Sequence, residues 1–275
     1  MSTKIKMSKK KKFLVVIGKD NSKINVSIDI LKYLNSMNDK NNEYYFFNAD
    51  KSNKLNKYIK KNLLNIEFSV LEKKIKKNEY DWLLSIWSSI IYKKEFLSKF
   101  KNNLNLHPSY LPYGRGTYPA VWAIYNSTPI GVTIHEMNSK LDKGKIYLRK
   151  KIFLPFPFNA HQVYMKSLSE IKKLFILNWK KIKDKKIKLK KITYNTKLNL
   201  RKHIVPHTFL DLDKKNSNNH NYKNLIMKIL SCDYNHKNSL QIKIDKNIYD
   251  TKIFMKKSKR KIFFKTKTEK KVKRK

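Results

Sequence analysis

Three polar side chains, Asn105, His107 and Asp142, have types and spacing that suit chemistry at a carbonyl group. Asn105 and His107 lie two positions apart in the segment 103–110 (NLNLHPSY), which we expect to form a strand that ends at Pro108. Because successive side chains of a strand point to opposite faces, both would face one pocket. An amide and an imidazole there can donate hydrogen bonds to an oxygen that becomes negative when a nucleophile attacks a carbonyl.

The carboxylate of Asp142 would complete such a site. It could hold the imidazole in a useful orientation, or help to move the proton that an attacking amine loses. Asp142 lies in the turn 141–144 (LDKG), where we expect Gly144 to let the backbone bend tightly. The alternating segment 130–137 could bring this turn back over the strand that carries His107.

The elements that must position these residues follow an α/β pattern, in which short apolar runs alternate with longer periodic stretches. This pattern predicts a mainly parallel sheet, and ligands of such sheets gather at the carboxyl ends of the strands. The predicted strands are 13–18, 44–49, 65–70, 82–87, 103–107, 130–137 and 145–154. The predicted helices are 23–37, 52–62, 93–99, 119–126 and 160–182.

We expect residues 1–200 to form the catalytic domain and residues 201–275 to form a small α+β C-terminal subdomain. The second segment contains a short apolar run that predicts a helix, followed by two weaker strand patterns. These are residues 225–230, 240–244 and 248–255. The first dozen residues and the final segment 267–275 are rich in lysine and are interpreted as mobile cationic tails.

The net charge of +44 suggests nucleic-acid binding, but the kind of basic residue argues against specific recognition. Of 64 basic residues only five are arginine, at positions 115, 149, 201, 260 and 274. Base recognition favours the bidentate guanidinium group. Lysine is also spread along the whole chain, as on a solvated surface. We therefore expect no specific nucleic-acid site.

The single cysteine, Cys232, allows no intrachain disulfide and fits a reducing compartment. The basic N-terminus is not followed by an apolar stretch, and no window reaches 18 uninterrupted apolar residues. We expect no signal peptide and no membrane span, and we predict a cytoplasmic protein.

Two segments together resemble a known family. NLHPSYLPYGRGTYP (105–119) and GVTIHEMNSKLDKGKI (131–146) are similar to the signature of the folate-dependent formyltransferases, including the gap of 35 positions between His107 and Asp142 (142 minus 107). The resemblance implies a Rossmann-like domain that uses 10-formyltetrahydrofolate. It also implies that Asn105, His107 and Asp142 match the catalytic triad. Lys143 and Tyr110 depart from the usual pattern, which leaves details of the donor site open.

The resemblance further implies two groups of binding residues. Those expected to line the folate pocket are Ser85, Ile86, Trp87, Ser88, Ile90, Glu136, Met137 and Asn138. Those expected on the acceptor side are Tyr110, Arg115 and His135, although His135 is equally compatible with packing and Arg115 with a structural role. His203, His207 and His220 lack a carboxylate at matched spacing, so we predict no metal.

In the expected mechanism a neutral amine attacks the formyl carbon. Asn105 and protonated His107 stabilise the oxyanion, while Asp142 orients His107 and assists proton transfer. A nearby carboxylate favours the protonated form of an imidazole.

Three functions stay open. The HPSYLPYGRG motif with Trp122 is most similar to enzymes that formylate a nucleotide-linked amino sugar, which is the leading hypothesis. Formylation of methionyl-tRNA is the alternative, favoured by the basic surface; against it, only about 70 residues follow position 205. A non-catalytic basic nucleic-acid-binding protein is the third. A homodimer is left open.

Overall fold

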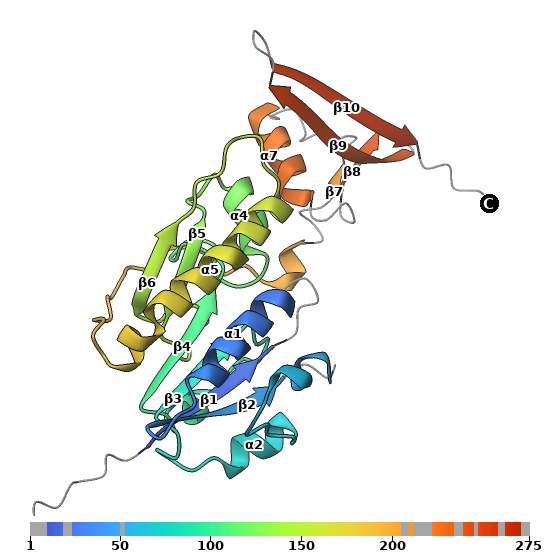
Figure 1. The fold of residues 1–275 in the computed structure, drawn as a ribbon. Helices are drawn as coiled ribbons and strands as arrows, with labels where there is room; N and C mark the ends of the chain where they lie inside the picture. Colours follow the sequence, from blue (N-terminus) through green and yellow to red (C-terminus); the bar gives the residue numbers. More distant parts are fainter. Residues whose placement is uncertain are drawn as a thin grey trace, which may run out of the picture. The chain divides into compact units, whose positions relative to one another are not determined.

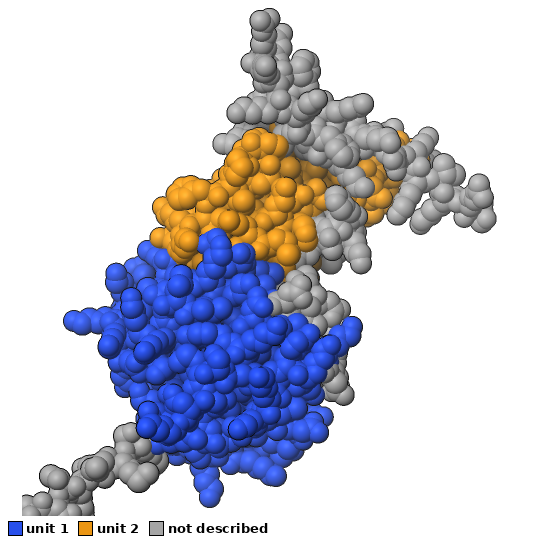
Figure 2. All heavy atoms as spheres, viewed as in Figure 1, with its two compact units in different colours: residues 1–107, 133–149, 168–193 blue, residues 108–132, 150–167, 194–275 orange. Residues whose placement is uncertain are grey.

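The computed structural model describes residues 10–18, 24–49, 53–204, 209–211, 222–233, 239–244, 247–257 and 262–270. The first nine residues and the last five, which belong to the predicted tails, lie outside this part, as do His207 and His220. The chain divides into two compact units (Figure 2). Unit 1 comprises residues 1–107, 133–149 and 168–193, and unit 2 comprises residues 108–132, 150–167 and 194–275.

A six-stranded sheet is the centre of the fold. Its order is β2 (Asn42–Asn48), β1 (Lys11–Ile17), β3 (Trp82–Ile86), β4 (Asn102–His107), β5 (Gly131–His135) and β6 (Ile146–Lys151). β1 pairs in parallel with β2 and β3, and β3 pairs in parallel with β4. β5 runs antiparallel to β4. The prediction of an α/β fold with a mainly parallel sheet is therefore confirmed.

One face of the sheet in unit 1 is covered by α1 (Ile24–Ser36) and the unit 1 part of α5 (Ala160–Lys183), which lie side by side (Figure 1). Phe13 stacks on Tyr44 at 4.4 Å between ring centroids and meets the ring of Trp179 edge-on. The indole Nε1 of Trp179 donates a hydrogen bond to the buried hydroxyl of Tyr44 over 2.9 Å. Aromatic packing and one satisfied polar pair thus hold α5 on the sheet.

The opposite face packs against α2 (Phe68–Lys74) and α3 (Lys94–Leu97). Leu14 and Val16 of β1 belong to this second cluster, whereas Phe13 faces the first, as the two-residue period of a strand requires. Val16 is aligned with Ser85, and Ser85 is aligned with Asn105. The side chain of Asn105 therefore lies on the face covered by α2 and α3.

The prediction of a strand over residues 65–70 is wrong, because α2 begins at Phe68. The apolar positions Phe68, Leu71 and Ile75 recur at helical spacing and all contact the cluster under α2. This period continues past residue 70, so the short window concealed it. The helix predicted over 52–62 is a shorter 3-10 helix, η2 (Asn53–Tyr58).

Unit 2 contains α4 (Pro119–Tyr125), which begins with proline in its first turn as expected, η3 (Arg201–His203) and α7 (Tyr222–Cys232). A four-stranded sheet has the order β10 (Ile262–Lys270), β9 (Asn247–Lys257), β8 (Leu240–Ile244) and β7 (Phe209–Asp211).

The cationic tail predicted from residue 267 is wrong for residues 267–270, which belong to β10. Phe264, Thr266 and Thr268 alternate with charged residues there, a strand pattern that the lysine content masked. Among the described helices, none is long and apolar enough to cross a bilayer.

Candidate active site

Strand β4 places two of the predicted catalytic residues. It ends at His107, immediately before Pro108, as the sequence predicts. Asn105 is aligned with Ser85 on one side and with His135 on the other, so these three side chains form a row across one face of the sheet. His107 lies one step further along the same face.

Asp142 lies in a tight turn that the loop after β5 forms. The backbone N–H of Lys143 donates to the carbonyl of Lys140 over 3.1 Å, and Asp142 has a φ of +50°. Asp and Asn tolerate this left-handed conformation better than most residues. The sequence assigned the sharp bend to Gly144, but the positive φ falls on Asp142.

Glycine is required at position 144 for another reason, because the loop leaves no room there for a side chain. A Cβ atom at this position would lie 1.6 Å from the carbonyl oxygen of Glu136. Next to this contact the N–H of Glu136 donates to the carbonyl of Lys145 over 2.8 Å. The loop therefore closes on itself only when residue 144 has no side chain.

This closure brings the carboxylate of Asp142 between two imidazoles. Its Oδ2 lies 3.8 Å from Nε2 of His107, and its Oδ1 lies 3.6 Å from Nε2 of His135. All three residues are buried, with exposed fractions of 5%, 1% and 7% for His107, His135 and Asp142. The two rings are nearly perpendicular, with centroids 5.9 Å apart. Unit 1 thus gathers the predicted triad into one cluster and adds His135.

His135 is held by hydrogen bonds at both ring nitrogens. Its Nδ1 lies 2.8 Å from the carbonyl oxygen of Glu136, and its Nε2 lies 3.3 Å from Nδ2 of Asn105. Burial lowers the pKa of His135 to about 4; the carboxylate of Asp142 opposes this shift and His107 adds to it. The ring is therefore neutral at neutral pH.

The same cluster has the composition of a metal site. One ligand atom each from His107, His135 and Asp142 lies within 4.8 Å of the others, the one such group found among the described residues. Two imidazoles and a carboxylate form a ligand set that zinc and iron enzymes use. For a metal site the sequence analysis considered His203, His207 and His220 rather than this cluster. Of these three only His203 lies in the described part, and its Nδ1 accepts a hydrogen bond from the N–H of Leu200.

The predicted folate segment 85–90 follows the end of β3. Ser85 and Ile86 are buried in the strand, and the Oγ of Ser88 accepts the N–H of Ile90. Trp87 has a φ of +52°, and its buried indole Nε1 has no hydrogen-bond partner among the described residues. A Cβ at Gly18 would lie 1.8 Å from the carbonyl oxygen of Trp87, so the neighbouring loop also needs glycine.

The second predicted folate segment, Glu136, Met137 and Asn138, lies in the loop that carries Asp142. Met137 donates its N–H to Oδ1 of Asn103. The sequence analysis did not include Asn103 among the residues of this loop's surroundings, although it lies two positions before Asn105. The side chain of Asn138 donates to the carbonyl of Lys143. Met137 and Ile90 pack against the same apolar cluster, so both folate segments border it.

The two remaining acceptor-side candidates, Tyr110 and Arg115, belong to unit 2. The guanidinium of Arg115 is buried, donates to the carbonyl of Thr196 over 2.9 Å and lies 5.9 Å from the ring centre of Tyr194. These contacts suit a structural role that ties the glycine loop to residues 194–199. The amine of Lys151 lies 5.7 Å from the ring centre of Tyr110.

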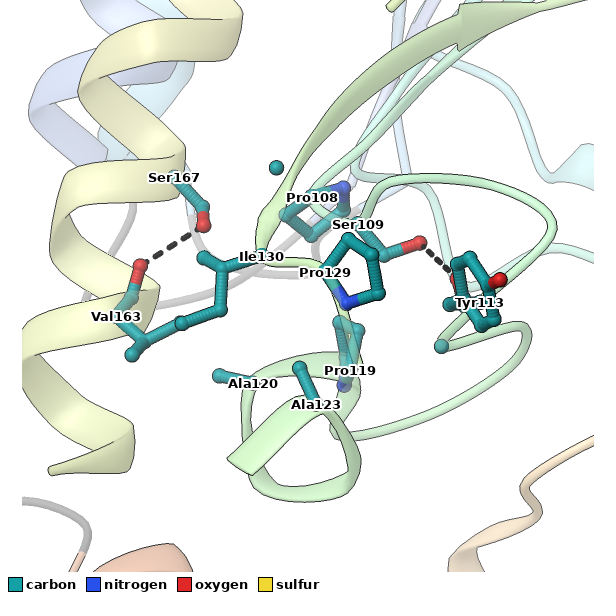
Figure 3. Close-up of a pocket in the computed structure, with 12 residues that line it drawn as sticks. Pro108, Ser109, Tyr113, Pro119, Ala120, Ala123, Pro129, Ile130, Val163 and Ser167 are labelled. Carbon is teal, nitrogen blue, oxygen red and sulfur yellow. Dashed lines mark hydrogen bonds between the residues drawn. The ribbon is translucent and has the colours of Figure 1, made fainter. Parts of the chain in front are cut away.

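A small hollow in unit 2 is lined by Pro108, Ser109, Pro119, Ile130 and Val163, among others (Figure 3). Within it Ser109 donates to the carbonyl of Tyr113, and Ser167 donates to the carbonyl of Val163. The space holds about one water molecule. It is therefore too small for a folate or a sugar nucleotide.

Fold and site together define an α/β protein with a half-buried amide, a buried imidazole and a buried carboxylate next to the carboxyl end of a central strand. Residues 57–176 match the family described as formyl transferase. This part of the chain is therefore similar to that family.

Curated relatives of two kinds are similar to this chain. A dTDP-4-amino-4,6-dideoxyglucose formyltransferase from Mycobacterium bovis is 29% identical over 117 residues, which are 42% of this chain and 50% of the relative. A methionyl-tRNA formyltransferase from Ehrlichia ruminantium is 38% identical over 97 residues, which are 34% of this chain and 31% of the relative. The chain thus spans half the length, or less, of these relatives.

Solved structures share the fold over most of the chain. A 4-N formyltransferase from Francisella tularensis has a TM-score of 0.71 at 22% identity and covers 86% of this chain and 93% of its own. An N-formyltransferase from Helicobacter canadensis, solved with folinic acid and dTDP-3-aminofucose, has a TM-score of 0.67 at 18% identity, covering 94% and 98%.

Proposed function

We propose that this protein transfers a formyl group from 10-formyltetrahydrofolate to the amino group of a nucleotide-linked amino sugar. The observation that carries the proposal is the cluster in unit 1 of the half-buried Asn105 with the buried His107 and Asp142. The match of residues 57–176 to the formyl transferase family supports it. Residues 1–200 would carry the reaction, and the segment from 201 would be accessory.

The residues around the site fit a folate donor. Trp87 offers a buried indole N–H that lacks a partner among the described residues, and a nitrogen or oxygen of a bound heterocycle could accept it. Ile90 and Met137 border the apolar cluster from two segments and would contact the ring system. The Helicobacter canadensis structure was solved with folinic acid, which supports a folate ligand for this fold. When bound, the donor would supply the activated formyl carbon.

Each member of the cluster has a separate task. Asn105 has one amide N–H directed at His135, and its second N–H would donate to the formyl oxygen as negative charge develops. Protonated His107 would donate to the same oxygen. Asp142, 3.8 Å from His107, would hold that imidazolium and take up the proton that the attacking amine releases. The bond between the formyl carbon and the folate nitrogen then breaks, and that nitrogen leaves with a proton as tetrahydrofolate.

The acceptor is assigned from two kinds of relatives. An amino-sugar nucleotide is supported by the relative from Mycobacterium bovis and by the Helicobacter canadensis structure, which contains dTDP-3-aminofucose. Methionyl-tRNA is the second candidate, because the matched part of the Ehrlichia ruminantium enzyme is 38% identical. The net charge of +44 would also supply phosphate contacts to RNA.

The test is incubation with 10-formyltetrahydrofolate and a panel of amino-sugar nucleotides, with methionyl-tRNA alongside, followed by mass detection of the product. The proposal predicts a gain of one formyl group on an amino sugar. It also predicts that turnover persists at salt concentrations that release non-specifically bound nucleic acid. A product on methionyl-tRNA alone would reassign the acceptor, and no product on any amine would leave a non-catalytic basic protein.

We further infer that the enzyme works in the cytoplasm and has no specific nucleic-acid partner. The single, buried Cys232 supports a reducing compartment. A homodimer is compatible with these features, and light scattering coupled to gel filtration decides between one and two copies.

A further inference from the structure

The hydrogen-bond chain through His135 fixes which atom of Asn105 faces the imidazole. A carbonyl oxygen can only accept, so the 2.8 Å contact between Glu136 and Nδ1 of His135 places the ring proton on Nδ1. In a neutral ring Nε2 then carries a lone pair. Only the amide nitrogen of Asn105, and not its oxygen, can form the 3.3 Å contact to that lone pair.

Of the groups that face His135, His107 favours the neutral ring, whereas Asp142 and the carbonyl of Glu136 favour the protonated ring. From β4 the facing groups are Asn105 and His107, and from the loop after β5 they are Asp142 and the carbonyl of Glu136. The ring is 1% exposed, and burial dominates the other influences, lowering the pKa of His135 to about 4. Near neutral pH His135 therefore remains an acceptor at Nε2.

Resting on the proposed function, we infer that His135 is a positioning residue whose Nε2 lone pair orients the amide of Asn105. The strand register supports this, because Asn105 and His135 are direct cross-strand partners. With one N–H of Asn105 held by His135, the second N–H is fixed in direction and serves the oxygen of the formyl group. Without this acceptor the amide could rotate by 180° and present its oxygen, which would repel the developing negative charge.

This assignment differs from the acceptor-binding role that the sequence suggested for His135. Both ring nitrogens already have protein partners, Glu136 at Nδ1 and Asn105 at Nε2. His135 has no further ring nitrogen to offer a substrate. Its effect on the reaction is therefore transmitted through Asn105.

The first test is the protonation pattern of His135 in the full chain. Long-range ¹H–¹⁵N spectra of protein labelled in histidine should show, at pH 7.5, one ring with a protonated Nδ1 and an unprotonated Nε2. The signal is assigned by its absence from the His135→Gln variant, and His203→Gln is the labelling control on an exposed histidine. A proton on Nε2 of His135 at this pH would overturn the inference.

The second test separates positioning from binding. His135→Leu removes the acceptor, whereas His135→Gln keeps an acceptor oxygen in a side chain of similar size. We expect kcat to fall by about 100-fold in the leucine variant, as for a misplaced catalytic group, with KM for the amine nearly unchanged. The glutamine variant should recover most of this loss. A rise in KM with unchanged kcat in the leucine variant would show that His135 binds substrate instead.

The two tests also distinguish failure of this inference from failure of the proposed function. Formyl transfer together with the opposite tautomer refutes only the positioning role. The expected tautomer without transfer to any amine refutes only the function. Circular dichroism of each variant confirms that the kinetic comparison concerns folded protein.

Discussion

Replacing Asp142 with asparagine isolates the charge of the carboxylate from its place in the turn. The left-handed backbone at Asp142, with a φ of +50°, suits asparagine as well as aspartate, so the turn should keep its shape. The side chain also keeps its size. The variant therefore removes one negative charge from between His107 and His135 and changes little else.

The magnitude follows from the distance between the charges. At 3.8 Å and an effective dielectric constant of about 20, the attraction between Asp142 and a protonated His107 is about 4 kcal/mol. If this attraction serves only the transition state, its loss corresponds to roughly 10³-fold in rate. The same order, about 10² to 10⁴-fold, is typical of the loss of a positioned acid or base. We expect kcat of Asp142→Asn to fall by about that factor.

The assay follows formyl transfer at saturating donor and acceptor, and folate affinity is measured by quenching of tryptophan fluorescence. Folate binding should change far less than turnover, because the predicted ring contacts lie at Trp87, Ile90 and Met137 rather than at Asp142. Asp29→Asn is the matched control, since Asp29 pairs with Lys172 at the surface of α1. Turnover of Asp142→Asn equal to that of the control would remove Asp142 from the mechanism.

Four further outcomes are expected. Gly144→Ala should lower the free energy of unfolding by at least about 2 kcal/mol and abolish turnover, because a Cβ would clash with Glu136; an unchanged melting temperature would contradict this. Tyr44→Phe should cost about 1 to 3 kcal/mol in chemical denaturation by leaving the indole of Trp179 unpaired, with turnover per folded molecule unchanged, and a stable variant would refute the role of this bond. Chelation by EDTA should leave turnover intact and excess zinc should inhibit, whereas loss of turnover on chelation would point to a resident metal at the site. The pKa of His135 in the folded protein lies near 4, below its ordinary value of 6.5, so the unfolded chain binds more protons between these two pH values. The free energy of unfolding should therefore fall by up to about 3 kcal/mol as the pH drops from 6.5 to 4. The His135→Gln variant should show a smaller fall.

The sequence predicted the elements that carry the site because each is marked by a clear local signal, either an apolar run or a proline at its end. The buried run of β1, the end of β4 at Pro108 and the proline at the start of α4 all follow local rules that no distant contact overrides. The spacing of Asn105 and His107 already implied a common face, and the register of β4 confirms that face.

Other features depend on contacts that a local pattern does not contain. The closeness of Asp142 to His107 requires the antiparallel pairing of β5 with β4 and the folding back of the loop over Glu136. The bond between Asn105 and His135 requires the register of that pair. Motif order indicated that these residues belong together, but their hydrogen-bond partners are set by the tertiary structure.

The errors also have physical causes. Residues 65–70 were predicted as a strand because the window ended before Leu71 and Ile75, whose spacing shows the helix. Residues 267–270 were predicted as a tail because the abundance of lysine concealed the alternation in β10. In both cases the apolar or small residues carried the correct signal.

The most direct measurement of the central claim is a double-mutant cycle on single-turnover formyl transfer, with Asn105→Ala, Asp142→Asn and the double variant. Residues that act on one reacting carbonyl as a unit lose most of their effect together, so the second substitution should add little to the loss caused by the first. Rate losses that multiply in the double variant would mean that Asn105 and Asp142 act independently, which contradicts a single shared centre.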